Sequence, residues 1–319
     1  MLPYILLIMG FVFLIKGAGD FVDGASSLAR KLSVSDLTVG LTVVAFGTSL
    51  PELFVNIFAS FQCNTDIAIG NVLGSNISNI LLILGIAAVV YPMAVTKGTV
   101  WKEIPLSLLA AVLVGVLAND AFFDGVGFST LTRIDGIIFI AFFIIFLYYT
   151  ASIARDITGI NKYVNKTEYR LRKVLFKIIL GLGGLFLGAN LVVDRAVYLA
   201  QKLGVSQSLV GLTIVAAGTS LPELATSAVA AYKKNAEIAI GNIVGSNIFN
   251  IFFILGISAI IKPLPFRKEL NIDAGMAILA SMLLFLCMFT GKKHKLDRWE
   301  GIIFIVLYIG YISFLIMRG

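Results

Sequence analysis

Ten stretches of mostly apolar residues follow one another along this chain, separated by short polar breaks. A helix needs roughly 20 such residues to cross the hydrocarbon core of a bilayer, and only helices and closed barrels satisfy their own backbone hydrogen bonds there. The pattern therefore predicts an all-α polytopic membrane protein with ten transmembrane helices. The expected spans lie near residues 3–30, 36–61, 67–90, 101–118, 132–153, 173–201, 207–232, 238–261, 270–290 and 298–317.

The spans leave little of the chain for anything else. Of the 319 residues, 59% are hydrophobic and 13% are charged, against about 25% charged in an average soluble domain. The longest connection, residues 154–172, is polar, basic and of linker length. We therefore expect no extramembrane domain.

The formal net charge of +7 raises the question of an acidic partner such as nucleic acid. In membrane proteins, however, Lys and Arg gather in cytoplasmic loops. With the N-terminus outside, seventeen of the 25 Lys and Arg residues fall on the cytoplasmic side and six outside. We expect a cell-membrane protein with both termini outside and a cytoplasmic linker at 154–172. Its expected partners are the lipid bilayer and ions, with no nucleic acid or protein partner, and the pattern is compatible with a monomer.

The chain contains an internal repeat at an offset of 171 residues. Residues 39–53 match residues 210–224 at thirteen of fifteen positions, and residues 67–86 match 238–257 at fifteen of twenty without a gap. The identities include Gly, Thr, Ser, Pro, Glu and Asn, so shared hydrophobicity does not explain them.

Each copy holds five expected spans, and an odd number makes the second copy enter the membrane from the opposite side. The sequence therefore predicts two inverted five-helix repeats, residues 1–153 and 173–319, joined by the linker 154–172. Their repeated motifs lie at 38–86 and 209–257. Inverted repeats are typical of secondary transporters, because a near-symmetric pair can open to either side of one central site.

Glu52 and Glu223 are the acidic residues that fall in the middle of strongly apolar spans, at equivalent repeat positions. An intramembrane charge costs about 3 kcal/mol or more and normally faces a cavity or an ion path. The alternative is a neutral, hydrogen-bonded acid or one paired with a base, but no Lys or Arg lies at comparable depth. We predict that both glutamates line an ion site.

A proline precedes each glutamate directly, at Pro51 and Pro222. Because proline lacks an N–H and its ring clashes with the preceding turn, we expect the helix to break there. The break would free carbonyls near residues 45–48 as ligands, with Ser49 or the threonine before it as the cap of a new half-helix. An ordinary proline kink is the alternative, but two kinks with a carboxylate at the same offset favour broken helices at the midplane.

A second polar element follows each glutamate, at residues 70–79 and 241–250. Its Asn and Ser residues recur every four positions and therefore share one helix face. Four of them are expected as ion ligands, namely Ser75, Asn79, Ser246 and Asn250. For the other asparagines, ligation and interhelical packing remain equally open: Asn71, Asn76, Asn242 and Asn247.

These residues offer only oxygen ligands, which suits a hard cation. Calcium takes six to eight oxygens, and two glutamates would neutralise one Ca²⁺, while Na⁺ accepts similar oxygens. Cys63 is expected in an outer loop, Cys287 inside an apolar span and the single His294 in a basic inner loop, so the sequence suggests neither a disulfide nor a metal cluster. We expect no enzyme activity and no cofactor, with Ca²⁺ and Na⁺ as transported ions.

The motifs at 47–52 and 70–76, with their copies at 218–223 and 241–247, resemble the cation/calcium antiporter superfamily in its prokaryotic sodium/calcium exchanger branch. In that family they form the two alpha repeats, and the helix plan is similar over essentially the full chain. The resemblance implies a ten-helix secondary active antiporter that exchanges Ca²⁺ for Na⁺ by alternating access.

The resemblance also implies ligands, position by position. The implied calcium ligands are two carboxylates and two main-chain oxygens, from Glu52, Glu223, Thr48 and Thr219. The implied sodium sites use the same glutamates with Ala45, Thr48, Ser49 and Ser75 in one half and Ala216, Thr219, Ser220 and Ser246 in the other. Asn79 and Asn250 match a midplane pair that several members fill with Asn and Asp. This chain has Asn at both positions, which leaves potassium-dependent exchange open; the proton-coupled branch normally lacks the Thr-Ser-Leu-Pro-Glu form.

Two other classes of protein share single features with this sequence. An intramembrane aspartyl protease would use the Gly-x-Gly-Asp match at residues 17–20, but the chain has no Tyr-Asp pair and the second repeat has Leu191 in place of the Asp. A passive calcium channel more often places acidic rings around an oligomer axis. We expect the aspartates near this motif, and their repeat mate Asp194, at wetted helix segments, with Arg195 as a candidate local partner.

Overall fold

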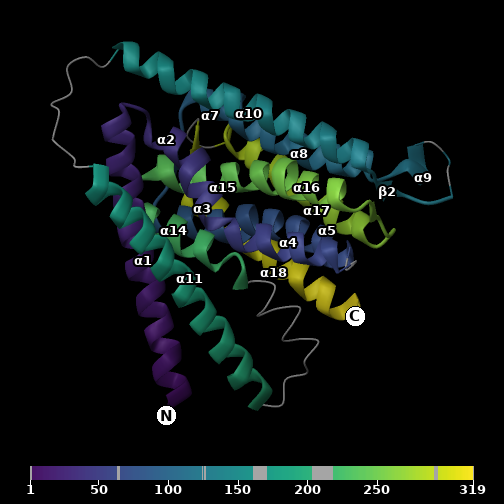
Figure 1. The fold of residues 1–319 in the computed structure, drawn as a ribbon, viewed down its shortest axis with the longest axis horizontal. Helices are drawn as coiled ribbons and strands as arrows, with labels where there is room; N and C mark the ends of the chain where they lie inside the picture. Colours follow the sequence, from purple (N-terminus) through teal and green to yellow (C-terminus); the bar gives the residue numbers. More distant parts are fainter. Residues whose placement is uncertain are drawn as a thin grey trace.

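The computed structural model describes residues 2–62, 65–123, 125, 127–160, 171–202, 218–290 and 294–318. Within them, eight helical segments are long and apolar enough to cross a membrane. Figure 1 shows these segments as a bundle of long helices. Five are single helices: α1 (Leu2–Leu32), α10 (Arg133–Ile160), α11 (Leu171–Lys202), α17 (Leu270–Cys287) and α18 (Arg298–Arg318).

The other three are built from consecutive elements. The first joins α5 (Thr65–Ser78), η2 (Asn79–Leu84) and α6 (Gly85–Val90), and its counterpart joins α15 (Ala236–Ile248), η4 (Phe249–Leu255) and α16 (Gly256–Ile261). The third joins α7 (Lys97–Trp101) and α8 (Glu103–Leu117). A short helix, α9 (Asp120–Phe123), follows.

A ninth span is broken. It consists of α2 (Asp36–Val39), η1 (Gly40–Val44) and α3 (Ala45–Thr48), followed after Ser49 by α4 (Leu50–Phe61), and its two parts differ in direction by 48°. The break lies where Pro51 predicts it. Of the span expected at 207–232, the structure describes residues 218–232, which include α14 (Leu221–Tyr232). The count of ten therefore stays a prediction.

The two motif-bearing spans lie at the centre of the bundle. In their most apolar windows, 78% of the residues of Thr65–Val90 and 83% of those of Ala236–Ile261 are buried, against 22% for Arg133–Ala154. Each central span contains a π-helical turn, η2 beginning at Asn79 and η4 beginning one residue before Asn250. Such turns widen a helix locally and are frequent at functional sites.

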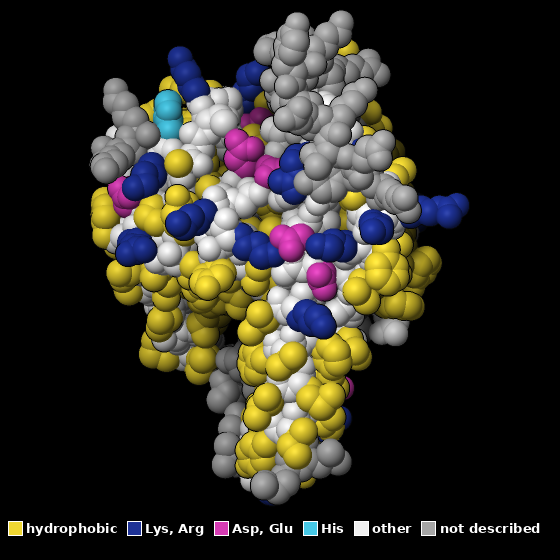
Figure 2. Space-filling view, turned by 90° about the vertical axis from the view of Figure 1, so that its left-hand side faces the viewer, with side chains coloured by type: hydrophobic (Ala, Val, Ile, Leu, Met, Phe, Trp, Pro, Cys, Tyr) yellow, Lys and Arg dark blue, Asp and Glu magenta, His cyan; other side chains and the backbone are white. Residues whose placement is uncertain are grey.

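Helices α1 and α11 form a close pair at one side of the bundle (Figure 1). Glycines permit the contact, because a Cβ at Gly181 would lie 2.5 Å from the Phe21 nitrogen and one at Gly17 would lie 2.6 Å from the Leu185 nitrogen. Figure 2 shows this side of the molecule: charged side chains gather across its upper part, and the projecting lower part is almost wholly hydrophobic. That division is what a bilayer boundary requires.

The expectation of an all-α protein needs one correction, because the structure contains two small antiparallel sheets. Strand β1 (Met93–Ala94) pairs with β4 (Lys295–Leu296), and β2 (Thr130–Leu131) pairs with β3 (Leu264–Pro265). Two-residue strands carry no detectable alternation of polarity, so hydropathy does not reveal them. Each sheet joins a loop of the first half to a loop of the second.

The boundaries of the predicted linker differ from those of the helices. Helix α10 continues to Ile160, and α11 begins at Leu171. Residues 161–170 lie outside the described part of the chain. The division into 1–153, a linker and 173–319 stays a prediction.

Candidate functional site

Glu52 and Glu223 lie in the first turns of α4 and α14, each next to a proline. Both side chains are fully buried. None of the ion pairs in the described part of the chain involves either residue. Two buried carboxylates without an ion-pair partner among the described residues thus lie at the positive N-terminal ends of α4 and α14.

Serines from opposite halves join the two carboxylates into one site. The Ser49 hydroxyl donates to Glu223 Oε1 over 3.0 Å, and the equivalent Ser220 hydroxyl donates to Glu52 Oε1 over 3.5 Å. Ser75 also donates to Glu52 Oε1, over 3.4 Å. Each half thus supplies a hydroxyl to the carboxylate of the other, and neither half completes the site alone.

The prediction that Ser49 or Thr48 caps α4 is met by the position of Ser49, but neither side chain makes a capping hydrogen bond. Ser49 stands at the N-cap position without a capping hydrogen bond. The Thr48 hydroxyl has several acceptors within reach of its one proton, among them the Val44 carbonyl oxygen at 3.1 Å and Asn242 Oδ1 at 3.0 Å. A cap oxygen normally accepts from the second or third N–H of the helix. Pro51 fills the second position and has no N–H, which removes one of these two donors. The Ser49 hydroxyl donates to Glu223 instead.

Five buried oxygens around this site have no hydrogen-bond partner among the described residues. They are Glu52 Oε2, Glu223 Oε2, Asn79 Oδ1, Asn250 Oδ1 and Thr219 Oγ1. Buried polar atoms are nearly always satisfied in native structures, and exceptions need an explanation. Carboxylate, amide and hydroxyl oxygens without donors form the ligand set that a hard cation requires.

The amide nitrogens of the midplane asparagines hold the two central helices together. Asn79 donates to Asn247 Oδ1 over 2.9 Å, and Asn250 donates to Asn76 Oδ1 over 3.0 Å. With their nitrogens engaged in this way, the amides of Asn79 and Asn250 keep their oxygens free. Asn76 and Asn247 use both side-chain atoms between helices, and this geometry favours packing for them.

The two remaining asparagines also contact the other motif helix of their own half. Asn71 donates to Asn56 Oδ1 over 2.7 Å, and Asn242 donates to Ser227 Oγ over 2.9 Å. Asn56 and Ser227 occupy equivalent positions and are fully buried, yet the sequence reasoning missed them. They could have been found as polar residues that occur at equivalent positions of the two repeats within otherwise apolar helices.

The structure describes some of the other expected ligands and not all of them. Ser246 Oγ lies 3.5 Å from the Ala45 carbonyl oxygen as a donor, and the Ser49 N–H donates to the same oxygen over 3.1 Å. The Ala45 carbonyl therefore already has hydrogen-bond donors. Ala216 lies outside the described residues.

Two further acids, Glu103 and Glu300, are nearly as buried as the glutamates of the site, at 1% exposure each. They lie at the first turns of α8 and α18, and Tyr149 and Thr290 donate to them. No cluster of three or more His, Cys, Asp or Glu residues occurs in the described ranges. Glu103 Oε2 also has no hydrogen-bond partner among the described residues, so an unpartnered oxygen does not by itself distinguish the site. Glu52 and Glu223 differ because unpartnered amide and hydroxyl oxygens, from Asn79, Asn250 and Thr219, accompany them.

Comparison with known proteins gives consistent matches over the full chain. The sodium/calcium exchanger protein family model matches residues 2–151 and 173–317. The putative antiporter CaxA of Alkalimonas amylolytica is 38% identical over 317 residues, covering 96% of each chain. The sodium/calcium exchanger MaX1 of Methanosarcina acetivorans is 32% identical over 340 aligned positions, covering 97% of each chain.

Among solved structures, the sodium-calcium exchanger NCX_Mj, soaked with zero Na⁺ and Ca²⁺, matches with a TM-score of 0.83 and 35% identity. The match covers 98% of this chain and 99% of that one. The similarity in sequence and fold therefore extends over nearly the whole chain, and the resemblance carried by the repeated motifs is confirmed. This multi-pass membrane protein belongs to the sodium/calcium exchanger family.

Proposed function

We propose that this protein is a secondary active antiporter that exchanges Ca²⁺ for Na⁺ by alternating access, with Glu52 and Glu223 at its ion site. The observation that carries the proposal is the pair of buried carboxylates whose second oxygens have no donor among the described residues. Two negative charges neutralise one Ca²⁺, and Na⁺ can compete for the same oxygens with less charge.

The amides at Asn79 and Asn250 fit a site that must release its ion. They supply oxygen ligands without adding to the two charges of the glutamates. An ion that is to be transported must bind weakly enough to leave. A third carboxylate at the midplane would hold a divalent cation more strongly.

Contacts that recur when the two halves are exchanged support the inverted-repeat architecture. The Asn76 amide donates to the Asn247 carbonyl (3.1 Å), and the Asn247 amide donates to the Asn76 carbonyl (3.3 Å), across an offset of 171 residues. Strand β1 is the repeat equivalent of β3, so the β1–β4 and β2–β3 pairings are the same contact with the halves exchanged. A two-fold axis between the halves produces such reciprocity.

The proposal is tested with purified protein in proteoliposomes. We expect an outward Na⁺ gradient to drive Ca²⁺ uptake, and outward K⁺ or H⁺ gradients of equal size to drive little. Because an antiporter couples the two fluxes, Ca²⁺ should not enter liposomes that lack internal counter-ion. Ca²⁺ uptake without an internal counter-ion would indicate a channel. Ca²⁺ uptake driven by a K⁺ or H⁺ gradient, and not by a Na⁺ gradient, would show that K⁺ or H⁺ is the coupling ion.

The topology is tested separately by single-cysteine labelling in a background without Cys63 and Cys287. The Lys and Arg distribution predicts that Asn165→Cys, in the linker at 154–172, reacts with an impermeant maleimide only after the membrane is opened. Phe128→Cys, in the loop that precedes α10, should react in intact cells. The reverse pattern would invert the topology and leave the exchange activity unaffected.

A further inference from the structure

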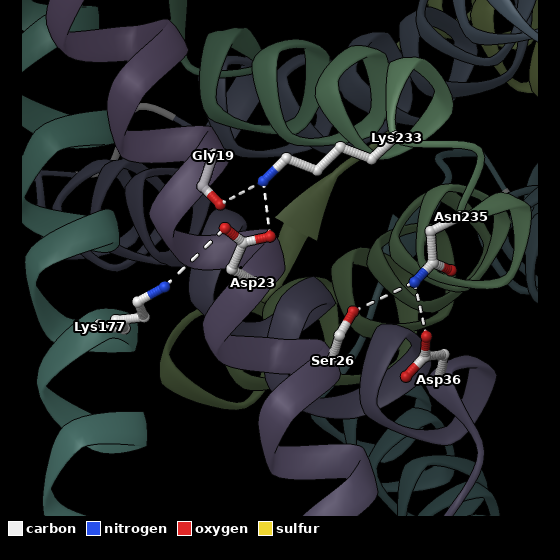
Figure 3. A network of polar contacts seen from close by, with 7 residues as sticks. All are labelled: Gly19, Asp23, Ser26, Asp36, Lys177, Lys233 and Asn235. Carbon is white, nitrogen blue, oxygen red and sulfur yellow. Dashed lines mark hydrogen bonds and ion pairs between the residues drawn. The ribbon is translucent and has the colours of Figure 1, made fainter. Parts of the chain in front are cut away.

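A cluster of polar contacts binds α1 to the turn between α14 and α15 (Figure 3). The Lys233 ammonium lies 2.6 Å from Asp23 Oδ1 and donates to the Gly19 carbonyl over 2.9 Å. Lys177 of α11 approaches the other Asp23 oxygen at 3.9 Å. Asp23 therefore faces two cations that come from different helices.

Asn235, two residues after Lys233, extends the cluster to α2. Its side-chain nitrogen donates to Ser26 Oγ over 3.1 Å and to Asp36 Oδ2 over 2.5 Å, as Figure 3 shows. Its side-chain oxygen caps α15 by accepting from the Ile238 N–H. The turn is thus fastened both to α1 and to the start of α2.

The two lysines play different parts in this cluster. Lys177 belongs to α11, which packs against α1 along the glycine contacts, so the Lys177–Asp23 pair lies within one helix pair. Lys233 belongs to the α14–α15 turn and connects this turn to α1. Separation of α1 from the α14–α15 turn would break the Lys233 bonds and leave Asp23 with Lys177.

The repeat offset shows that this bridge has no charged counterpart at the opposite face. The residue equivalent to Asp23 is Asp194, whereas the residue equivalent to Lys233 is Gln62. Within the described part of the chain, no ion pair of Asp194 occurs. An exchange of conformation between the halves would therefore replace an ion pair by a contact between a carboxylate and a neutral amide.

We propose that Lys233 and Asp23 form a one-sided latch that favours the conformation closed at the face of the α14–α15 turn, which is predicted to be cytoplasmic. The inference rests on the proposed alternating access. The side chains of Lys233 and Asp23 are 33% and 46% exposed. Because exposed ion pairs are weak, this pair should shift the equilibrium between the closed and open conformations of that face about two- to fivefold. The latch thus sets a preferred resting side without fixing the transporter there.

The latch is tested by measuring how far α1 lies from the rest of the bundle. Spin labels at Leu32→Cys on α1 and Trp299→Cys on α18, both exposed, report the distance by electron–electron double resonance in nanodiscs. In a background without the native cysteines, Lys233→Gln should raise the ratio of separated to closed molecules about two- to fivefold. Gln62→Lys should also raise it, because it offers a cation to Asp194 in the opposite conformation.

Matched variants separate the latch from a general loss of charge. Lys234→Gln removes the same charge one residue away, and Lys234 makes no ion pair in the described ranges. This variant and Lys233→Arg should keep the wild-type distance distribution.

Ionic strength provides a second control. Raising it with choline chloride from ~0.01 to ~1 M shortens the screening length from about 30 to about 3 Å. The distance distribution of the wild type should then approach that of Lys233→Gln.

An unchanged distribution in Lys233→Gln, with a normal melting temperature, overturns the latch. A shift in Lys233→Gln but not in Gln62→Lys overturns only the counterpart contact at Asp194. Equal shifts in Lys233→Gln and Lys234→Gln assign the effect to net charge and overturn the specific pair. None of these results requires transport, so failure of Na⁺-driven Ca²⁺ uptake in the wild type is a separate outcome that contradicts the proposed function.

Discussion

Replacing either Glu52 or Glu223 by glutamine is expected to reduce Na⁺-driven Ca²⁺ uptake by more than about a hundredfold. Glutamine keeps the shape and one oxygen ligand but removes one of the two charges that balance a buried Ca²⁺. Leaving a buried charge uncompensated costs about 3–5 kcal/mol, and about 1.4 kcal/mol corresponds to a tenfold change in affinity. The measurement is initial uptake of radioactive calcium into proteoliposomes at matched protein density.

Glu103→Gln is the matched control for this experiment. Glu103 is buried at 1% exposure on α8 and accepts a hydrogen bond from Tyr149, and glutamine preserves that acceptor. We expect this variant to keep most of the wild-type uptake. Near-normal uptake by Glu52→Gln or Glu223→Gln would show that this glutamate is not part of the ion site. An equal loss in all three variants would show that uptake is sensitive to the loss of any buried carboxylate, wherever it lies.

A large loss of stability is expected from Gly245→Val, on the central helix α15. A Cβ at this position would lie 2.6 Å from the Leu41 carbonyl oxygen and 2.8 Å from the Ala45 Cβ. These atoms belong to the broken span that carries the site, and a backbone carbonyl cannot move aside as a side chain does. Overpacking costs about 1–3 kcal/mol and occasionally more, so we expect a melting temperature lower by several degrees and little remaining transport.

Gly275→Val provides the control in a neighbouring helix. Gly275 is exposed on α17, and nothing lies within 4 Å of a Cβ built there. The melting temperature of detergent-solubilised protein, followed by the monodisperse fraction that survives heating, should drop for Gly245→Val and stay near wild type for Gly275→Val. Equal melting temperatures for the two variants would show that α15 and the broken span do not pack as closely as described.

The positions of the described membrane spans and the break at Ser49 were accessible from the sequence. Span length follows from bilayer thickness, and proline breaks a helix through its own missing N–H and ring. Both causes act within one stretch of chain, so neither needs a tertiary contact. The two glutamates were accessible for a related reason, because the cost of an intramembrane charge depends on depth rather than on a particular neighbour.

The family was also accessible, since its motifs are contiguous and occur twice. The identity of each side chain's partner was not. The sequence allowed Ser49 to cap its own helix and Arg195 to serve the nearby aspartates, whereas in the structure Ser49 donates to Glu223 and Asp23 faces Lys233 and Lys177.

These partners lie on opposite halves of the chain, 174 residues apart for Ser49 and Glu223 and 210 for Asp23 and Lys233. Hydropathy and local backbone chemistry determine where a helix begins, ends or bends. Only the docking of one repeat against the other decides which hydroxyl reaches which carboxylate, because that choice depends on the relative position of two elements whose sequences are each compatible with several neighbours. The sequence alone therefore determined the spans, the break and the buried charges, and the tertiary structure decided how the two halves share one site.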